Sequence, residues 1–96
     1  MQIREAQEWV KDAWSKSEKR MNKVSELASF MEECGELGEA IRKIEHGKDT
    51  KVDMEKEIGD ILLSLLTLAI RYDVDLQNAF DKTMESVKSK YIVKNF

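Results

Sequence analysis

The chain of 96 residues contains no proline, one cysteine, one histidine and four glycines. The single cysteine, Cys34, excludes an intrachain disulfide and argues against a zinc site built from cysteines. The single histidine, His46, has no second histidine to join it in a metal site, and its place beside Gly47 favours a role at a helix end. The absence of proline, with abundant Glu, Lys, Leu and Ala, favours an all-helical fold.

Long apolar runs and a basic charge balance are missing as well. The longest apolar run, residues 61–70, is too short to span a bilayer and contains Ser64 and Thr67. Residues 1–20 mix charged and apolar side chains and lack the pattern of a signal peptide. The formal net charge of −3 argues against a nucleic-acid binder, which would carry a basic face. We therefore expect one cytoplasmic domain over residues 1–96, with neither a membrane nor a nucleic acid as partner.

Four helices follow from the spacing of the apolar residues, which recur at i, i+3, i+4 and i+7. They are predicted at residues 2–17, 22–45, 50–72 and 75–91. Short loops between long helices favour antiparallel neighbours, so the expected fold is all-α, a four-helix up-down bundle. The third helix is apolar nearly all round and is expected at the centre. Because the chain is small, we also expect a homodimer or a homotetramer.

The ends of these helices carry capping signals. Asn22 is the expected N-cap of the second helix, and Gly47 follows its C-terminal end. Thr50 with Asp53 resembles a capping box that opens the third helix, and Asp75 is the expected N-cap of the fourth. The fourth helix is expected to turn five apolar residues inward, namely Leu76, Ala79, Phe80, Met84 and Val87.

Two acidic pairs lie in segments that otherwise read as core-facing helices. Glu33 with Glu36, and Glu57 with Asp60, are each spaced i, i+3, which places both members on one helix face. Antiparallel packing brings the two pairs into register. Four such carboxylates repel one another and resist burial unless a cation lies between them. Mg²⁺ suits this donor set, with Mn²⁺ as a substitute, and the expected substrate is a phosphate ester or anhydride.

The residues around these pairs resemble a known family. Residues 31–41, Met-Glu-Glu-Cys-Gly-Glu-Leu-Gly-Glu-Ala-Ile, are similar to the EExxE helix of the MazG-like nucleotide pyrophosphohydrolases. Residues 55–62, Glu-Lys-Glu-Ile-Gly-Asp-Ile-Leu, are similar to the ExxD helix of that family. The resemblance covers residues 22–91, and the two motifs occur in the family's order.

This resemblance implies an all-α protein that assembles as dimers or dimers of dimers. It also implies Mg²⁺-dependent hydrolysis of nucleoside triphosphates to the monophosphate and pyrophosphate. The metal ligands implied by position are Glu33, Glu36, Glu57 and Asp60. Glu32 matches the first acidic position of the motif, and Glu32 and Glu33 are the expected catalytic residues that orient or deprotonate the attacking water.

Two residues, Lys90 and Trp14, are expected to bind the substrate. Lys90 stands where the family often has an arginine before an aromatic residue, and lysine binds phosphate as a point charge. Trp14 either stacks on the base of a nucleoside triphosphate or packs in the core or at a subunit interface. Trp9 is expected in the core or at an interface. Gly35 and Gly59 lie inside predicted helices, where close approach of a second helix or of a metal would explain them.

Two other functional classes remain open from the sequence. A non-catalytic helical interaction module could use the acidic face to bind a basic partner in a salt-sensitive way. A di-iron carboxylate bundle ranks lower, because that class pairs Glu-x-x-His motifs and His46 lies outside both acidic motifs.

Overall fold

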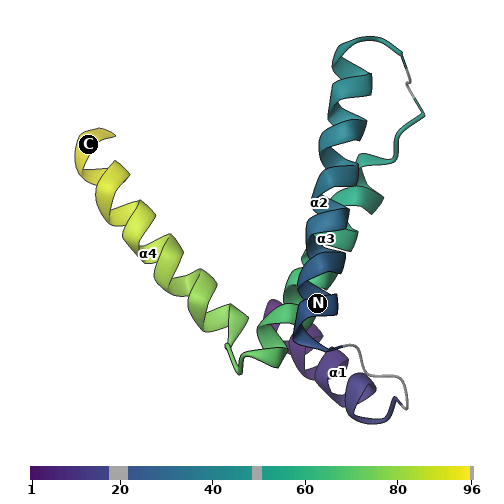
Figure 1. Ribbon diagram of the computed structural model, residues 1–96. Helices are drawn as coiled ribbons and strands as arrows, with labels where there is room; N and C mark the ends of the chain where they lie inside the picture. The colour runs from purple at the N-terminus through teal and green to yellow at the C-terminus, as the bar shows by residue number, and fades with distance from the viewer. Residues whose placement is uncertain (18–21, 49–50, 96) are drawn as a thin grey trace.

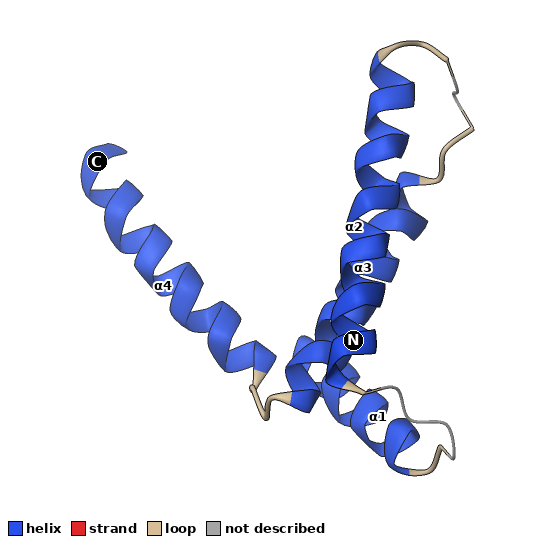
Figure 2. Ribbon diagram, viewed as in Figure 1, coloured by secondary structure: helices blue, strands red, loops and turns tan. Residues whose placement is uncertain are grey.

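The computed structural model describes residues 1–17, 22–48 and 51–95. This part of the chain contains four α-helices and no strands (Figure 1, Figure 2). The helices are α1 (Ile3–Ser15), α2 (Lys23–Glu45), α3 (Met54–Arg71) and α4 (Leu76–Asn95). The predicted all-α class is therefore confirmed. None of the described helices combines the length and the apolar character that a membrane span requires.

Short polar side chains cap α2 and α4 as the sequence predicts. Asn22 Oδ1 accepts a hydrogen bond from the backbone N–H of Ser25 at 2.8 Å, and Asp75 Oδ1 accepts one from Asn78 at 3.0 Å. Each contact satisfies one of the backbone donors that the first turn of a helix leaves without a partner. After α2, Gly47 adopts a φ of 66°, a left-handed conformation that favours glycine.

The start of α3 differs from the prediction. Asp53 is itself the N-cap, because its Oδ1 accepts a hydrogen bond from the backbone N–H of Lys56 at 3.0 Å. The helix therefore begins at Met54. Thr50, the other member of the expected capping box, lies outside the described residues.

The central unit is the antiparallel pair formed by α2 and α3, which lie side by side along most of their length (Figure 1). The start of α2 meets the end of α3, where the Lys23 ammonium lies 4.8 Å from the centre of the Tyr72 ring. Helix α1 packs against α3. Helix α4 projects away from the α2–α3 pair (Figure 1). The four helices therefore do not close into an up-down bundle within one chain.

Much of the apolar surface stays exposed in the single chain. Val10, Ala40, Leu66 and Ala69 are the buried apolar residues, and no described side chain reaches complete burial. The inward stripe predicted for α4 is buried only in part within one chain, where α1 contacts α4. Leu76, Ala79 and Met84 are half-buried. The other two residues of the stripe are exposed, Phe80 at 47% and Val87 at 41%.

Residues expected at close contacts also face open space. Trp9 is 68% exposed, so it does not belong to the core of this chain. A Cβ atom added at Gly35 or Gly59 would meet no described atom within 4 Å. The close helix approach expected at these glycines is therefore absent from the described part of the chain.

The direction of α4 is set by contacts with α1. The side chain of Gln7 donates to the carbonyl oxygen of Val74 at 2.7 Å and accepts from the backbone N–H of Leu76 at 2.9 Å. Arg4 lies 3.5 Å from Asp75 as an exposed ion pair. These contacts hold the short turn between α3 and α4 against α1.

A buried ion pair joins α2 to α3 near α1. Glu26 is only 4% exposed, and Arg71 Nε lies 2.8 Å from both of its carboxylate oxygens. A carboxylate removed from water in this way depends on its charged partner, because an unpaired buried charge is strongly unfavourable. The pair therefore fixes the alignment of the two helices at this end.

We predict that Arg71→Met lowers the free energy of unfolding by about 3 kcal/mol, because it leaves the buried Glu26 carboxylate without its partner. Urea denaturation at one fixed protein concentration measures the loss. The matched control is Arg42→Met, which removes an exposed i, i+3 pair with Glu39 and should lower the free energy of unfolding much less than Arg71→Met does. Equal losses in the two variants would contradict the structural role assigned to the Glu26–Arg71 pair.

Candidate metal centre

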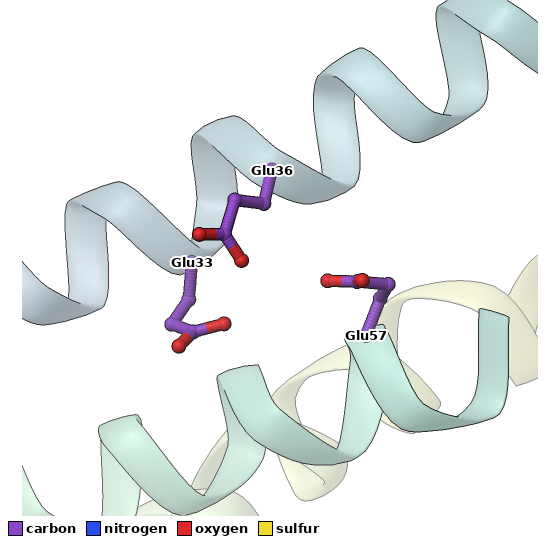
Figure 3. A group of neighbouring side chains, drawn as sticks. All are labelled: Glu33, Glu36 and Glu57. Carbon is purple, nitrogen blue, oxygen red and sulfur yellow. The ribbon is translucent and has the colours of Figure 1, made fainter. Parts of the chain in front are cut away.

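Three carboxylates converge in the space between α2 and α3. Glu33 and Glu36 extend from α2, and Glu57 extends from α3 toward them (Figure 3). One oxygen atom from each carboxylate lies within 4.8 Å of one from each of the others. We call Glu33, Glu36 and Glu57 the acidic cluster.

Helical spacing and antiparallel register build this cluster. The i, i+3 interval places Glu33 and Glu36 on one face of α2. Because α3 runs in the opposite direction, Glu57 near its start lies opposite Glu36, in the second half of α2. The register expected from the two motifs therefore exists within a single chain.

The acidic cluster is partly removed from water, and its negative charge is only partly compensated by neighbouring groups. The Oε2 atoms of Glu33 and Glu57 are buried and have no hydrogen-bond partner among the described residues. Burial raises the pKa of the Glu33 carboxyl, and the negative charges of Glu36, Asp60 and Glu57 raise it further. The nearby Lys56 ammonium partly offsets this rise. The folded chain thus holds carboxylates together at an electrostatic cost that a bound cation would relieve.

Asp60, the fourth predicted ligand, lies beside the cluster but is engaged elsewhere. Its Oδ2 accepts a hydrogen bond from Lys56 Nζ at 2.8 Å, and this contact is the main reason why the pKa of Lys56 is raised. The sequence reasoning missed Lys56, although its i, i+4 spacing from Asp60 is a sufficient signal for an ion pair on a helix. Lys56 is therefore the internal counter-ion of the acidic site.

The other predicted site residues lie at different distances from the cluster. Glu32 is exposed on α2, next to Glu33. Trp14 on α1 donates from Nε1 to Thr67 Oγ1 at 3.4 Å and reaches the α2–α3 face. Lys90 is exposed near the far end of α4, which projects away from the acidic cluster of its own chain (Figure 1). The roles assigned to these three residues stay predictions.

The donor set fits a hard divalent cation. All three groups of the cluster are carboxylates, which Mg²⁺, Ca²⁺ and Mn²⁺ prefer over softer ligands. Two buried oxygen atoms without partners supply open coordination positions. A site with only three protein ligands suits an ion that keeps part of its hydration shell and also binds phosphate.

We predict that Glu33→Gln raises the melting temperature of the protein at pH 7 in EDTA. The pKa of Glu33 in the folded state lies above its ordinary value of 4.5, so its ionisation above that pH destabilises the fold. The gain should shrink as the pH falls below 4.5, where Glu33 is protonated in both folded and unfolded states. Circular dichroism melts across this pH range measure the effect.

The control for this prediction is Glu39→Gln on the same helix. A hydrogen bond from Arg42 lowers the pKa of Glu39, so its removal should lower the melting temperature or leave it unchanged. A lower melting temperature for Glu33→Gln at pH 7 in EDTA would contradict the repulsion inferred for the cluster.

Comparison with known proteins places this site in context. The family model of the MazG nucleotide pyrophosphohydrolase domain matches residues 21–92. Two similar proteins come from Bacillus subtilis (strain 168). Uncharacterized protein YvdC is 26% identical across 95% of this chain and 97% of its own length. Uncharacterized protein YpjD is 36% identical across 69% of this chain and 67% of its own length.

No solved structure matches the chain. The family match covers α2 and α3 entirely, and with them all three residues of the acidic cluster together with Lys56 and Asp60. The chain therefore belongs to the MazG nucleotide pyrophosphohydrolase domain family.

Proposed function

We propose that this chain is a Mg²⁺-dependent nucleoside triphosphate pyrophosphohydrolase, which converts ribo- or deoxyribonucleoside triphosphates to the monophosphate and pyrophosphate. The observation that carries the proposal is the convergence of Glu33, Glu36 and Glu57, with two buried carboxylate oxygens that lack partners. Membership of a nucleotide pyrophosphohydrolase family supports the reaction class. The oxygen donor set supports a hard cation, for which Mn²⁺ would be a substitute.

Each acidic residue has a proposed role. Glu33, Glu36 and Glu57 would hold the ion between α2 and α3, and Asp60 would join them after the exposed Lys56 side chain moves aside. An ion held there would neutralise charge on the phosphates and would lower the pKa of a bound water molecule. Glu32 and Glu33 are proposed to orient the attacking water and to accept its proton.

The reaction is a displacement at the α-phosphorus. The water oxygen forms a bond to that phosphorus, and the bond to the oxygen that bridges the α- and β-phosphorus breaks. Pyrophosphate leaves with the electrons of the broken bond, and the proton of the water passes to a carboxylate. Catalysis of this kind depends on positioned groups and on compensation of phosphate charge, which is what the acidic site is arranged to provide.

We predict that Glu36→Gln or Glu57→Gln lowers the turnover number by at least about 100-fold. Ion-exchange chromatography of the products from a panel of nucleoside triphosphates, with Mg²⁺ and with EDTA, measures the reaction. Glu39→Gln is the matched control, because this exposed residue of α2 pairs with Arg42 outside the acidic cluster. Circular dichroism checks that every variant keeps its helices.

Three outcomes would count against the proposal. Full activity in both cluster variants would remove the acidic cluster from the mechanism. Diphosphate and phosphate as products would move the attack to the γ-phosphorus. An absence of product from every nucleotide, with salt-sensitive binding of a basic peptide, would favour the interaction-module alternative.

We also propose that the functional form is a homodimer or a homotetramer. Large apolar side chains that lie open in one chain support this proposal: Leu27, Met31, Ile58, Leu62 and Leu63 on the α2–α3 pair, with Phe80 and Val87 on α4. Such surface in a folded protein marks an interface. In an oligomer, Lys90 on the projecting α4 would reach the acidic site of another copy and contact its phosphates.

We predict that the protein has at least twice the 11.2 kDa mass of one chain at micromolar concentration. Sedimentation equilibrium measures this mass. Leu62→Glu, which places a charge on the exposed apolar face of α3, should shift the mass toward a single chain. Lys48→Glu, a charge change at an exposed position after α2, should not. A single-chain mass for the unmodified protein would refute the oligomer.

A further inference from the structure

A positively charged side chain lies at the edge of the acidic cluster. Lys56, in the first turn of α3, donates a hydrogen bond from Nζ to Asp60 Oδ2 at 2.8 Å. The charge of the same ammonium group also acts on Glu57 and Glu33, two members of the cluster. Lys56 therefore interacts with three of the four carboxylates that are proposed to bind the cation.

The carboxylate of Asp60 is engaged by Lys56 and does not join the acidic cluster. The carboxylate oxygens that lie within 4.8 Å of one another belong to Glu33, Glu36 and Glu57, and Asp60 is not part of that group. Its place on α3 would suit the group, because Asp60 follows Glu57 by three residues and shares its helix face. The contact that engages its carboxylate instead is the one with Lys56.

The energetics of α3 alone do not explain a lysine at this position. The backbone N–H of Lys56 donates to the capping side chain of Asp53 at 3.0 Å, so Lys56 lies in the first turn of the helix. A cation in the first turn is disfavoured by the positive end of the helix dipole. An i, i+4 ion pair is also weaker when the basic residue precedes the acidic one. The negative charge of the acidic site therefore accounts for the ammonium group at this position.

The contact between Lys56 and Asp60 can break without a rearrangement of α3. The side chain of Lys56 is 66% exposed, and an exposed ion pair contributes little to stability. The cap at Asp53 holds the backbone of Lys56 and leaves its side chain free to turn toward water. A divalent ion has twice the Coulomb attraction to a carboxylate that an ammonium group has at the same distance. Such an ion can therefore displace Lys56 from Asp60.

We propose that Lys56 competes with the divalent cation for Asp60 and thereby weakens cation binding to the substrate-free protein. The inference rests on the proposed function in one respect, because it assumes that the acidic cluster and Asp60 bind the cation. When the ion enters, the hydrogen bond from Lys56 breaks and an oxygen of Asp60 becomes available as a ligand. Lys56 is thus a positioning residue, and it sets the concentration of free cation at which the site fills.

A titration with Mn²⁺ tests the competition without nucleotide and without any catalytic step. Electron paramagnetic resonance measures the free Mn²⁺ that remains when the metal-free protein is titrated. Lys56→Gln should lower the Kd for Mn²⁺ by at least about fivefold, because the competing charge is gone. Lys56→Arg keeps the charge and should stay within about twofold of the unmodified protein. Lys48→Gln, the matched control, removes the same charge at an exposed position after α2 and should leave the Kd unchanged.

A second pair of variants separates competition at Asp60 from a general repulsion between Lys56 and the cation. In an Asp60→Asn protein, the further change Lys56→Gln should lower the Kd for Mn²⁺ by less than about twofold, because the contested carboxylate is absent. An equal gain with and without Asp60 would overturn the competition. Loss of Mn²⁺ binding in Asp60→Asn would support it, since the cation would then require the carboxylate that Lys56 holds. Circular dichroism melts with and without Mn²⁺ check the fold and report the affinity independently.

The outcomes distinguish this inference from the proposed function. Unchanged or weaker Mn²⁺ binding by Lys56→Gln, in a protein that hydrolyses nucleoside triphosphates, would overturn the competition and leave the pyrophosphohydrolase proposal intact. Tighter binding by Lys56→Gln but not by Lys56→Arg, in a protein that hydrolyses no nucleotide, would support the competition and overturn the reaction. An equal gain in affinity for both variants would show that the charge of Lys56 is not the cause, which would also overturn the competition.

Discussion

The repulsion among Glu33, Glu36 and Glu57 is the constraint that the α2–α3 pair has to accommodate. Like charges that are partly withdrawn from water disfavour the close approach of the helices that carry them. The approach is maintained by forces on either side of the cluster, including the apolar contacts of α3 and the buried Glu26–Arg71 pair. Lys56 adds a positive charge beside Asp60 and reduces the net repulsion. The chain therefore folds around an acidic site whose remaining charge is available to a cation.

Spacing along single helices was predictable from the sequence because it depends on local geometry. The intervals within the two acidic motifs, the caps at Asn22 and Asp75, and the glycine after α2 all follow from helical periodicity and backbone chemistry. The meeting of the two motifs followed from one further assumption, the antiparallel hairpin. The pairing of Lys56 with Asp60 is equally local, because it follows from their i, i+4 spacing on α3.

Contacts between distant segments were not predictable in the same way. Glu26 and Arg71 are 45 positions apart, and the sequence pattern does not show that their helix ends meet. The course of α4 was missed for a different reason. Its apolar residues indicate that the helix packs against something, but a pattern does not distinguish a helix of the same chain from a helix of another copy. In one chain, Phe80 stays 47% exposed and Val87 stays 41% exposed.

The two hydrogen bonds of Gln7 to the turn before α4 make the direction of that helix depend on the position of α1. A helix of 20 residues is about 30 Å long, so a rotation of about 10° at the turn displaces its far end by about 5 Å. Small changes in the first helix are thereby amplified into large changes in where the C-terminal segment lies. A substitution at Gln7 would thus change the direction of α4 and leave the acidic residues of α2 and α3 in place.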